Sequence, residues 1–149
     1  MSERLIDKLS MEQIEAILDT LPLEFIFIDE EGILRYYNKG EKRLLPGFDE
    51  VLDQDIRACH KPSSLPLTNK VLEDFKNGKT DEWQFWIDGL EDKILNRFFA
   101  VRNKEGKYLG CMEYLLNVTT MEKMTEAKKD AHRMTAPEPE GYKNKMGKE

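Results

Sequence analysis

The sequence has 149 residues, 40% of them hydrophobic, which suffices for one globular domain with flanking segments but not for two domains of ordinary size. Its 29 acidic residues outnumber the 23 basic ones, and the formal net charge of −6 argues against a surface that neutralises nucleic-acid phosphates. The chain has no secretory signal and no apolar run of membrane-spanning length, so we expect a cytoplasmic protein that contacts neither nucleic acid nor a membrane. Cys59 and Cys111 are too few for a disulfide framework and are expected to be free thiols.

The first element in the chain is an amphipathic helix. Ser10 and Gln13 have the spacing of a capping box, and Pro22 ends the segment. Apolar residues recur on one helical face, namely Ile14, Ile17, Leu18 and Leu21. This helix belongs to an N-terminal helical cap, residues 1–20. Because its apolar row is longer than one sheet face needs, we expect the helix from Ser10 to Leu21 to mediate homodimerisation.

A β-hairpin and a block of short helices follow. The aromatic and β-branched residues of LEFIFID (23–29) and ILRYYN (33–38) predict two strands, with Gly32 able to adopt the positive φ of the turn between them. The polar stretch 39–64, interrupted by glycine and proline, predicts short helices rather than a strand.

The second half of the chain begins with a helix and continues as a β-meander. Pro66 can open an amphipathic helix that ends near Asn77. In DEWQFWI (81–87), apolar side chains alternate with mostly polar ones, as in a half-buried strand. Short polar turns connect this segment to KILNRFFAVR (93–102) and YLGCMEYLLNVT (108–119). These segments predict three antiparallel strands.

The C-terminal part should contain a last helix and a tail. Thr119 and Glu122 have capping-box spacing at the start of a helix over 119–134. Residues 135–149 are rich in proline, glutamate, lysine and glycine without periodicity, which predicts a disordered tail. Together the elements predict an α+β fold: a five-stranded antiparallel sheet with helices on one face and flanking N- and C-terminal helices.

This order of elements resembles a PAS domain over residues 21–123, with the domain proper at 21–118. FIFIDEEGILRYYN (25–38) is similar to the family's opening hairpin, and GCMEYLLNVTTMEKM (110–124) to its closing strand, with Asn117-Val118-Thr119 where many members carry Asp-Ile-Thr. ACHKPSSLPLTNKVLEDFKNGKTDEWQFWI (58–87) resembles the PAS module found C-terminal to hemerythrin-like domains in bacterial and archaeal proteins.

The resemblance implies a sensory module of signal transduction rather than an enzyme. The family's helical block encloses a ligand-sized cavity that holds haem, flavin, a small metabolite or nothing, so the cofactor stays unknown. We expect a stand-alone module without an output domain of its own, which acts on an unidentified output protein. Flavin photochemistry is disfavoured. A resemblance to the flavin photoreceptors of the family would need an Asn-Cys-Arg-Phe-Leu run, which this sequence lacks.

The adjacent residues Cys59 and His60 invite a catalytic or metal-binding interpretation. Sequence neighbours do not face each other as a nucleophile and its base must, which argues against catalysis. His60 falls in the helical block and could ligate haem iron, making the protein a gas or redox sensor. However, the resemblance to oxygen-sensing PAS proteins places the proximal histidine in the helix over 65–77, which contains none. Alternatively, His60 caps a helix end or bonds a backbone carbonyl, and Cys59 packs as a small hydrophobe.

Aromatic residues could wall a pocket for a planar ligand or could simply form the core. Including the polar candidates, the expected ligand contacts are Phe27, Cys59, His60, Trp83, Phe85, Asn96, Phe98 and Tyr114. Asn96, Arg97 and Glu113 lie in central strands, where they contact a ligand only if they face the cavity. Three functions remain open: a ligand-binding sensory module, a haem-dependent sensor using His60, and a dimerisation domain whose cavity is filled by side chains.

Overall fold

The computed structural model describes residues 4–130 of the chain. The chain divides into two compact units, Met1–Val118 and Thr119–Glu149. The sheet, the helical block and the first helix all belong to the first unit.

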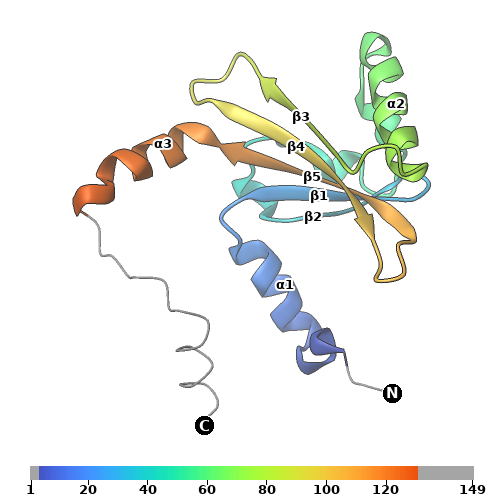
Figure 1. Ribbon diagram of the computed structural model, residues 1–149, viewed down its shortest axis with the longest axis horizontal. Helices are drawn as coiled ribbons and strands as arrows, with labels where there is room; N and C mark the ends of the chain where they lie inside the picture. Colours follow the sequence, from blue (N-terminus) through green and yellow to red (C-terminus); the bar gives the residue numbers. More distant parts are fainter. Residues whose placement is uncertain (1–3, 131–149) are drawn as a thin grey trace. The chain divides into compact units, whose positions relative to one another are not determined.

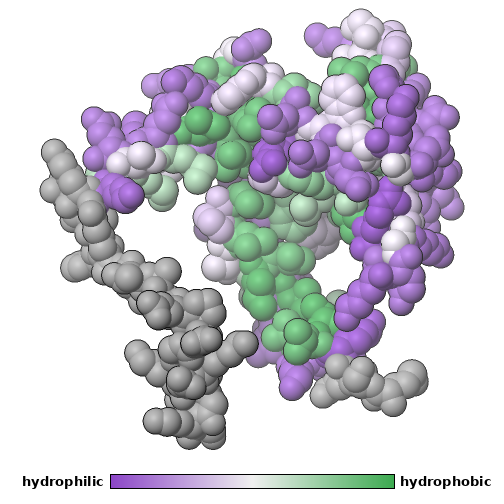
Figure 2. Space-filling model, viewed as in Figure 1, coloured by the Kyte–Doolittle hydropathy of each residue, from purple (hydrophilic) through white to green (hydrophobic). Residues whose placement is uncertain are grey.

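The expected N-terminal helix is α1, Met11–Thr20, which follows a short 3-10 helix at Leu5–Lys8. The Ser10 hydroxyl accepts a hydrogen bond from the Gln13 amide at 3.0 Å, and the Gln13 side chain accepts one from the Ser10 amide at 2.9 Å, as a capping box requires. None of the residues of α1 is buried. Its apolar side chains therefore remain at the surface, where Figure 2 shows hydrophobic residues gathered along the helix.

The five strands are β1 (Glu24–Asp29), β2 (Leu34–Tyr37), β3 (Glu82–Ile87), β4 (Ile94–Arg102) and β5 (Tyr108–Asn117). They form one sheet in the order β2-β1-β5-β4-β3, and every neighbouring pair is antiparallel (Figure 1). The expected five-stranded antiparallel sheet is confirmed. Gly32, between β1 and β2, adopts the predicted positive φ of 89°.

Between β2 and β3 the chain forms the expected helical block. Four 3-10 helices, at Gly40–Lys42, Phe48–Glu50, Ile56–Cys59 and Pro62–Ser64, precede α2 at Leu65–Lys76. α2 buries Val71 and Phe75, and it packs on the sheet mainly at β4 and β5. The helical block therefore covers one face of the sheet.

The strand register decides which side chains face this block. Ile26 and Ile28 of β1 lie in one core cluster with Leu34 and Ile56, while Cys111 of β5 clusters with Val71 and Phe75 of α2. Because side chains alternate along a strand, the residues that pair with these face the same way, and their neighbours face the opposite side. That opposite side carries the stacked rings of Phe99 and Tyr114, 5.7 Å apart.

At the end of β5 the chain enters α3 (Val118–Glu126), followed by a 3-10 helix at Ala127–Asp130. The remainder of the predicted helix 119–134 and the predicted tail 135–149 lie outside the described residues. Within residues 4–130, no helix combines the length and the apolar character needed to cross a membrane.

Candidate ligand-binding site

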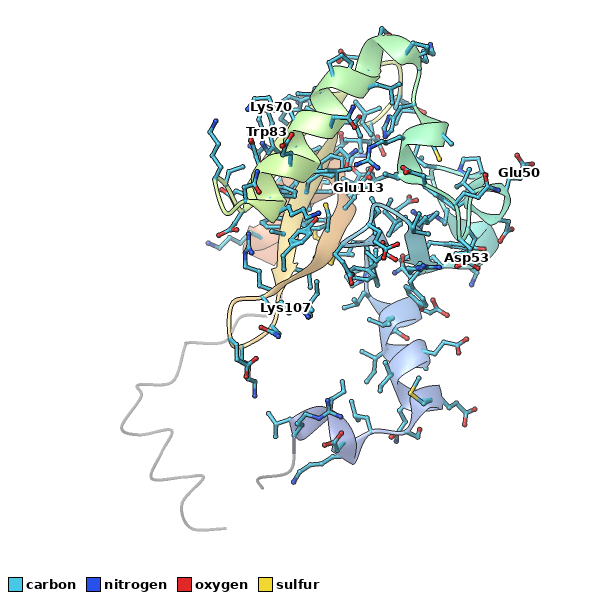
Figure 3. All side chains as sticks on the ribbon, turned by 90° about the vertical axis from the view of Figure 1, so that its right-hand side faces the viewer. Glu50, Asp53, Lys70, Trp83, Lys107 and Glu113 are labelled. Carbon is cyan, nitrogen blue, oxygen red and sulfur yellow. The ribbon has the colours of Figure 1, made fainter. Side chains whose placement is uncertain are left out.

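A cavity of about 370 Å³ lies between the helical block and the sheet. Its walls come from β1, the 3-10 helices Ile56–Cys59 and Pro62–Ser64 with His60 between them, α2, β3, β4 and β5. Figure 3 shows Trp83 and Glu113 on the side of the sheet where α2 lies. The volume falls within the range of small-molecule sites in proteins, roughly 300–1,000 Å³.

Most of the cavity wall is apolar. The aliphatic residues of the wall are Ile28, Ile56, Leu67, Val71 and Leu72. Three aromatic residues, Trp83, Phe85 and Phe98, come from β3 and β4, and the rings of Phe85 and Phe98 lie 5.3 Å apart. Such a surface suits a flat, largely apolar molecule.

A polar pair, Asn96 of β4 and Glu113 of β5, interrupts the apolar wall. Asn96 Nδ2 donates a hydrogen bond to Glu113 Oε1 at 2.8 Å. The Asn96 side chain is almost fully enclosed, with 5% of the residue exposed, and its Oδ1 is a buried atom without a hydrogen-bond partner. Buried acceptors are normally satisfied, so this atom marks a place where a donor is missing.

The surroundings of Glu113 shift the pKa of its carboxyl. Burial raises the pKa of its carboxyl, while the hydrogen bond from Asn96 and the charge of Arg43 oppose that shift. Arg43 itself is held by Glu24, whose Oε2 lies 3.3 Å from Arg43 Nη2. Glu113 is therefore a carboxyl group that takes up a proton more readily than an exposed one.

The two cysteines differ in position and neither is activated. Cys111 lines the cavity and is buried, and burial raises the pKa of its thiol to about 12. Cys59 is exposed and does not line the cavity; the partial burial of its thiol, and then the charges of Glu113 and Asp55, raise its pKa as well. At neutral pH both stay protonated and are poor nucleophiles.

His60 lies at the cavity, but not as a helix-capping side chain. Its backbone N–H donates to Arg57 O at 3.2 Å, whereas its imidazole has no hydrogen-bond partner among the described residues. Desolvation lowers the pKa of the imidazole, so the ring is neutral at physiological pH. No group of three or more His, Cys, Asp or Glu side chains within the described part of the chain could hold a metal ion.

Five of the eight expected contact residues line the cavity, namely His60, Trp83, Phe85, Asn96 and Phe98. The structure corrects the positions of Phe27 and Tyr114, which face the opposite side of the sheet. Phe27 lies between Ile26 and Ile28, whose side chains face the helical block, and alternation turns it away. Tyr114 accompanies it on that side, where its hydroxyl accepts a hydrogen bond from Arg97 Nη1 at 2.7 Å.

Glu113, like Asn96 and Arg97, is a strand residue whose side the sequence left undecided. It stands two residues from Cys111 and two from Leu115, both buried, so the period-2 pattern was the available signal for its orientation. Its hydrogen bond with Asn96 depends on the register of β4 against β5, in which Asn96 pairs with Leu115 and Phe98 with Glu113.

Comparison with known proteins agrees with this architecture. A family model described as PAS domain matches residues 14–119, and the chain belongs to this family of sensory modules, which are typical of signal transduction. The chain is also similar to the crystal structure of a C-terminal domain from Streptococcus mutans, with 28% identity, a TM-score of 0.71, and coverage of 78% of this chain and 90% of that one.

Two further solved structures show the same fold at lower identity. The PAS domain of a Colwellia psychrerythraea protein is 18% identical, with a TM-score of 0.53 and coverage of 74% of this chain and 98% of that one. The PAS domain of Bordetella pertussis BvgS is 14% identical, with a TM-score of 0.54 and coverage of 81% and 98%. No curated protein matches the chain significantly.

Proposed function

We propose that this PAS domain binds a small organic molecule in the cavity between α2 and the sheet and passes the binding event to an output protein. The observation that carries the proposal is the unsatisfied acceptor Asn96 Oδ1, on a residue that lines a largely apolar cavity of about 370 Å³. A cavity filled by its own side chains would leave neither the space nor the missing donor.

Two connections can carry a signal away from the cavity wall. At one end, Asn38 Nδ2 donates to Leu18 O of α1 at 2.8 Å and so links the β1–β2 hairpin to this helix. At the other end, β5, which carries Glu113 and Cys111, continues directly into α3 at Val118. A ligand that shifts β5 would therefore act on the start of α3, and through it on a partner.

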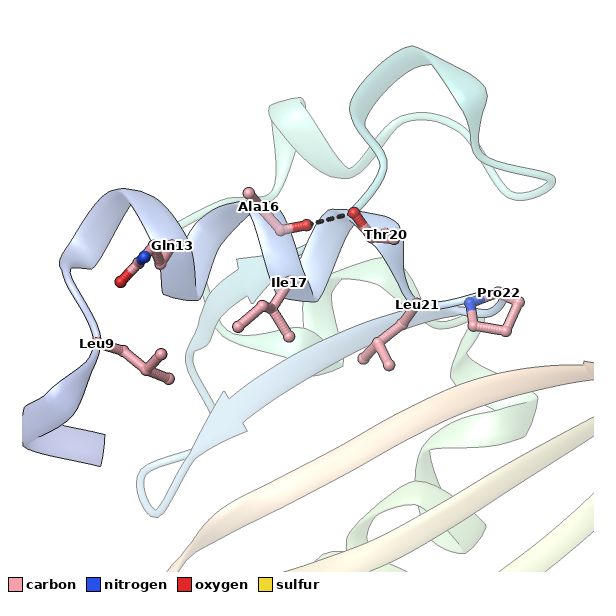
Figure 4. A pocket seen from close by; sticks show the side chains of 7 residues that line it. All are labelled: Leu9, Gln13, Ala16, Ile17, Thr20, Leu21 and Pro22. Carbon is pink, nitrogen blue, oxygen red and sulfur yellow. Dashed lines mark hydrogen bonds between the residues drawn. The ribbon is translucent and has the colours of Figure 1, made fainter. Parts of the chain in front are cut away.

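We further propose that the module works as a homodimer through α1. An apolar groove of about 580 Å³ follows this helix (Figure 4), and its lining residues carry no formal charge: Leu9, Gln13, Ala16, Ile17, Thr20, Leu21 and Pro22. An uncharged apolar face can pack against its own copy across a two-fold axis without like-charge repulsion. Burying a few hundred Å² of it contributes several kcal/mol at about 25 cal/mol per Å², before the entropic cost of association.

Haem is the second candidate ligand, and one observation favours it. The imidazole of His60 is at the cavity and is neutral, and no hydrogen bond to a described residue occupies the ring nitrogen that an axial ligand needs. The protein would then be a gas or redox sensor.

Native mass spectrometry together with an absorbance scan of the purified chain tests the proposal. We expect a bound small molecule and no Soret band. A Soret band would instead identify the ligand as haem. If the chain carries no added mass, even after incubation with a small-molecule extract of cells, both the organic ligand and haem are contradicted. The remaining function is then that of a dimerisation domain.

A further inference from the structure

Asn96 and Glu113 both line the cavity and carry hydrogen-bond acceptors, and their chemistry restricts what can bind there. Asn96 uses Nδ2 to hold Glu113 Oε1 at 2.8 Å, and this bond fixes the amide so that Oδ1 is the atom left over. Among the described residues, no hydrogen bond satisfies Oε2 of Glu113. The pair thus offers two neighbouring acceptors from adjacent strands.

The local charge favours donors as well. Arg43 is the cationic group whose charge reaches Glu113, and it is already engaged with Glu24 and with the carbonyl oxygens of Phe25 and Asn38. It therefore does not provide a free donor for an anionic ligand. None of the described residues that line the cavity is Lys or Arg, so a carboxylate or phosphate would find no cationic partner there, and Glu113 in its ionised form would repel it.

The walls determine the shape of the molecule that carries the donors. Trp83, Phe85 and Phe98 supply aromatic surface next to the acceptor pair. A planar ring can pack against these side chains while its edge points at Asn96 and Glu113. Aliphatic polyols and sugars have donors but lack the flat apolar body that this wall favours.

We infer that the cavity takes a small planar aromatic molecule with an N–H donor edge, such as an amino-substituted heterocycle, whose donors bind Asn96 Oδ1 and the Glu113 carboxylate. This inference rests on the proposed ligand-binding function and specifies the chemical class of the ligand. A single water molecule bound to Asn96 is the competing explanation of the unsatisfied oxygen.

The test uses a matched pair of probes with the full chain in a calorimetric titration. 2-Aminobenzimidazole presents an amino group beside a ring N–H, and 2-methylbenzimidazole has nearly the same size but lacks the amino donors. We expect the amino probe to bind wild type on the order of tenfold more tightly, because each hydrogen bond to a charged group contributes appreciably.

Two variants connect this preference to the acceptor pair. Glu113→Gln replaces one of the two carboxylate acceptor oxygens by an amide donor, and Asn96→Leu removes Oδ1 with little change in size, so each should reduce the preference to less than about threefold. Circular dichroism and thermal unfolding establish whether each variant is folded. If Glu113→Gln does not fold, Asn96→Leu alone provides the test.

Equal affinity of the two probes in wild type, or no binding of the amino probe, would overturn the inference in favour of a water-filled site. Retention of the full preference in both folded variants would overturn it too, by placing the donors elsewhere. These results leave the proposed function intact if native mass spectrometry still finds another small molecule, so the two proposals fail separately.

Discussion

The side-chain amide of Asn38 donates a hydrogen bond to the carbonyl oxygen of Leu18, 2.8 Å away, and this contact fastens α1 to the sheet. The same amide donates to Leu23 O at 3.0 Å and accepts from the Phe25 amide at 2.8 Å. Asn38 is completely buried, with 0% of the residue exposed. One side chain thus satisfies backbone groups of the helix, the linker and the first strand.

Asn38→Ala should lower the free energy of unfolding by about 2–4 kcal/mol, because it leaves several buried backbone groups without partners and opens a small cavity. Urea denaturation followed by circular dichroism measures the change. Asn77→Ala, at the exposed C-cap of α2, is the matched control and should cost under about 1 kcal/mol. Equal losses in the two variants would contradict the role of Asn38.

Glu113 should make the stability of the protein fall as pH rises. Burial raises the pKa of its carboxyl in the folded chain above the ordinary 4.5 of the unfolded chain. At a pH between the unfolded and the folded pKa, the folded chain therefore holds a proton that the unfolded chain releases. The free energy of unfolding then decreases by up to about 1.4 kcal/mol per pH unit in that window, and is unaffected by this group below it.

Glu113→Gln should remove this slope, which urea denaturation across the acidic range can measure. The groups that act on Glu113 are Asn96, which bonds it, and Arg43, with Cys111 beside it on β5. His60 contributes the opposite slope, because its lowered pKa makes stability rise with pH up to about its ordinary value of 6.5. Subtracting the free energy of unfolding of the variant from that of wild type cancels the His60 contribution. If this difference does not change with pH, the prediction is refuted.

The proposed dimer predicts that a charge in the α1 groove separates the two copies. Ile17 is 48% exposed and lines the groove, so Ile17→Asp should weaken self-association at least about tenfold. Sedimentation velocity at high micromolar concentration distinguishes dimer from monomer. Glu12→Gln on the same helix, outside the groove, should sediment as wild type does. A monomeric wild-type protein would end the proposal.

Hemin should not bind saturably to the wild-type chain if the ligand is an organic donor molecule. A porphyrin ring in the cavity would press against the carboxyl of Glu113 without supplying it a hydrogen bond. A titration followed at the Soret band tests this, with His60→Ala and Cys59→Ser as the paired variants. A saturable band that disappears in His60→Ala and persists in Cys59→Ser would instead establish His60 as the axial ligand.

The sheet could be predicted from the sequence because alternation and turn residues act over a few positions. Which side chains of a strand face the helical block could not be predicted, as β1 shows. EFIFID is apolar on both sides, so its pattern does not reveal whether Phe27 or Ile26 and Ile28 face the helices. The helical block decides that point, and it turns Phe27 away from the cavity.

The polar pair was beyond prediction for a related reason. Asn96 and Glu113 are polar residues of central strands, and that much is visible in the sequence. Their hydrogen bond depends on the register of β4 against β5, which the turn between them sets together with an irregularity between Val101 and Arg102. No local pattern encodes that register.

Blocking the cavity tests the central claim, ligand binding between α2 and the sheet, most directly. Thr68 lines the cavity from α2, and Thr68→Trp should fill it, whereas Lys70→Trp puts the same side chain on the same helix outside the cavity. The thermal unfolding midpoint is measured with and without a small-molecule extract of cells, since a ligand stabilises the state it binds. The account predicts that the extract raises the midpoint of wild type and Lys70→Trp but not that of Thr68→Trp. An equal rise in Thr68→Trp, or no rise in wild type, would contradict it.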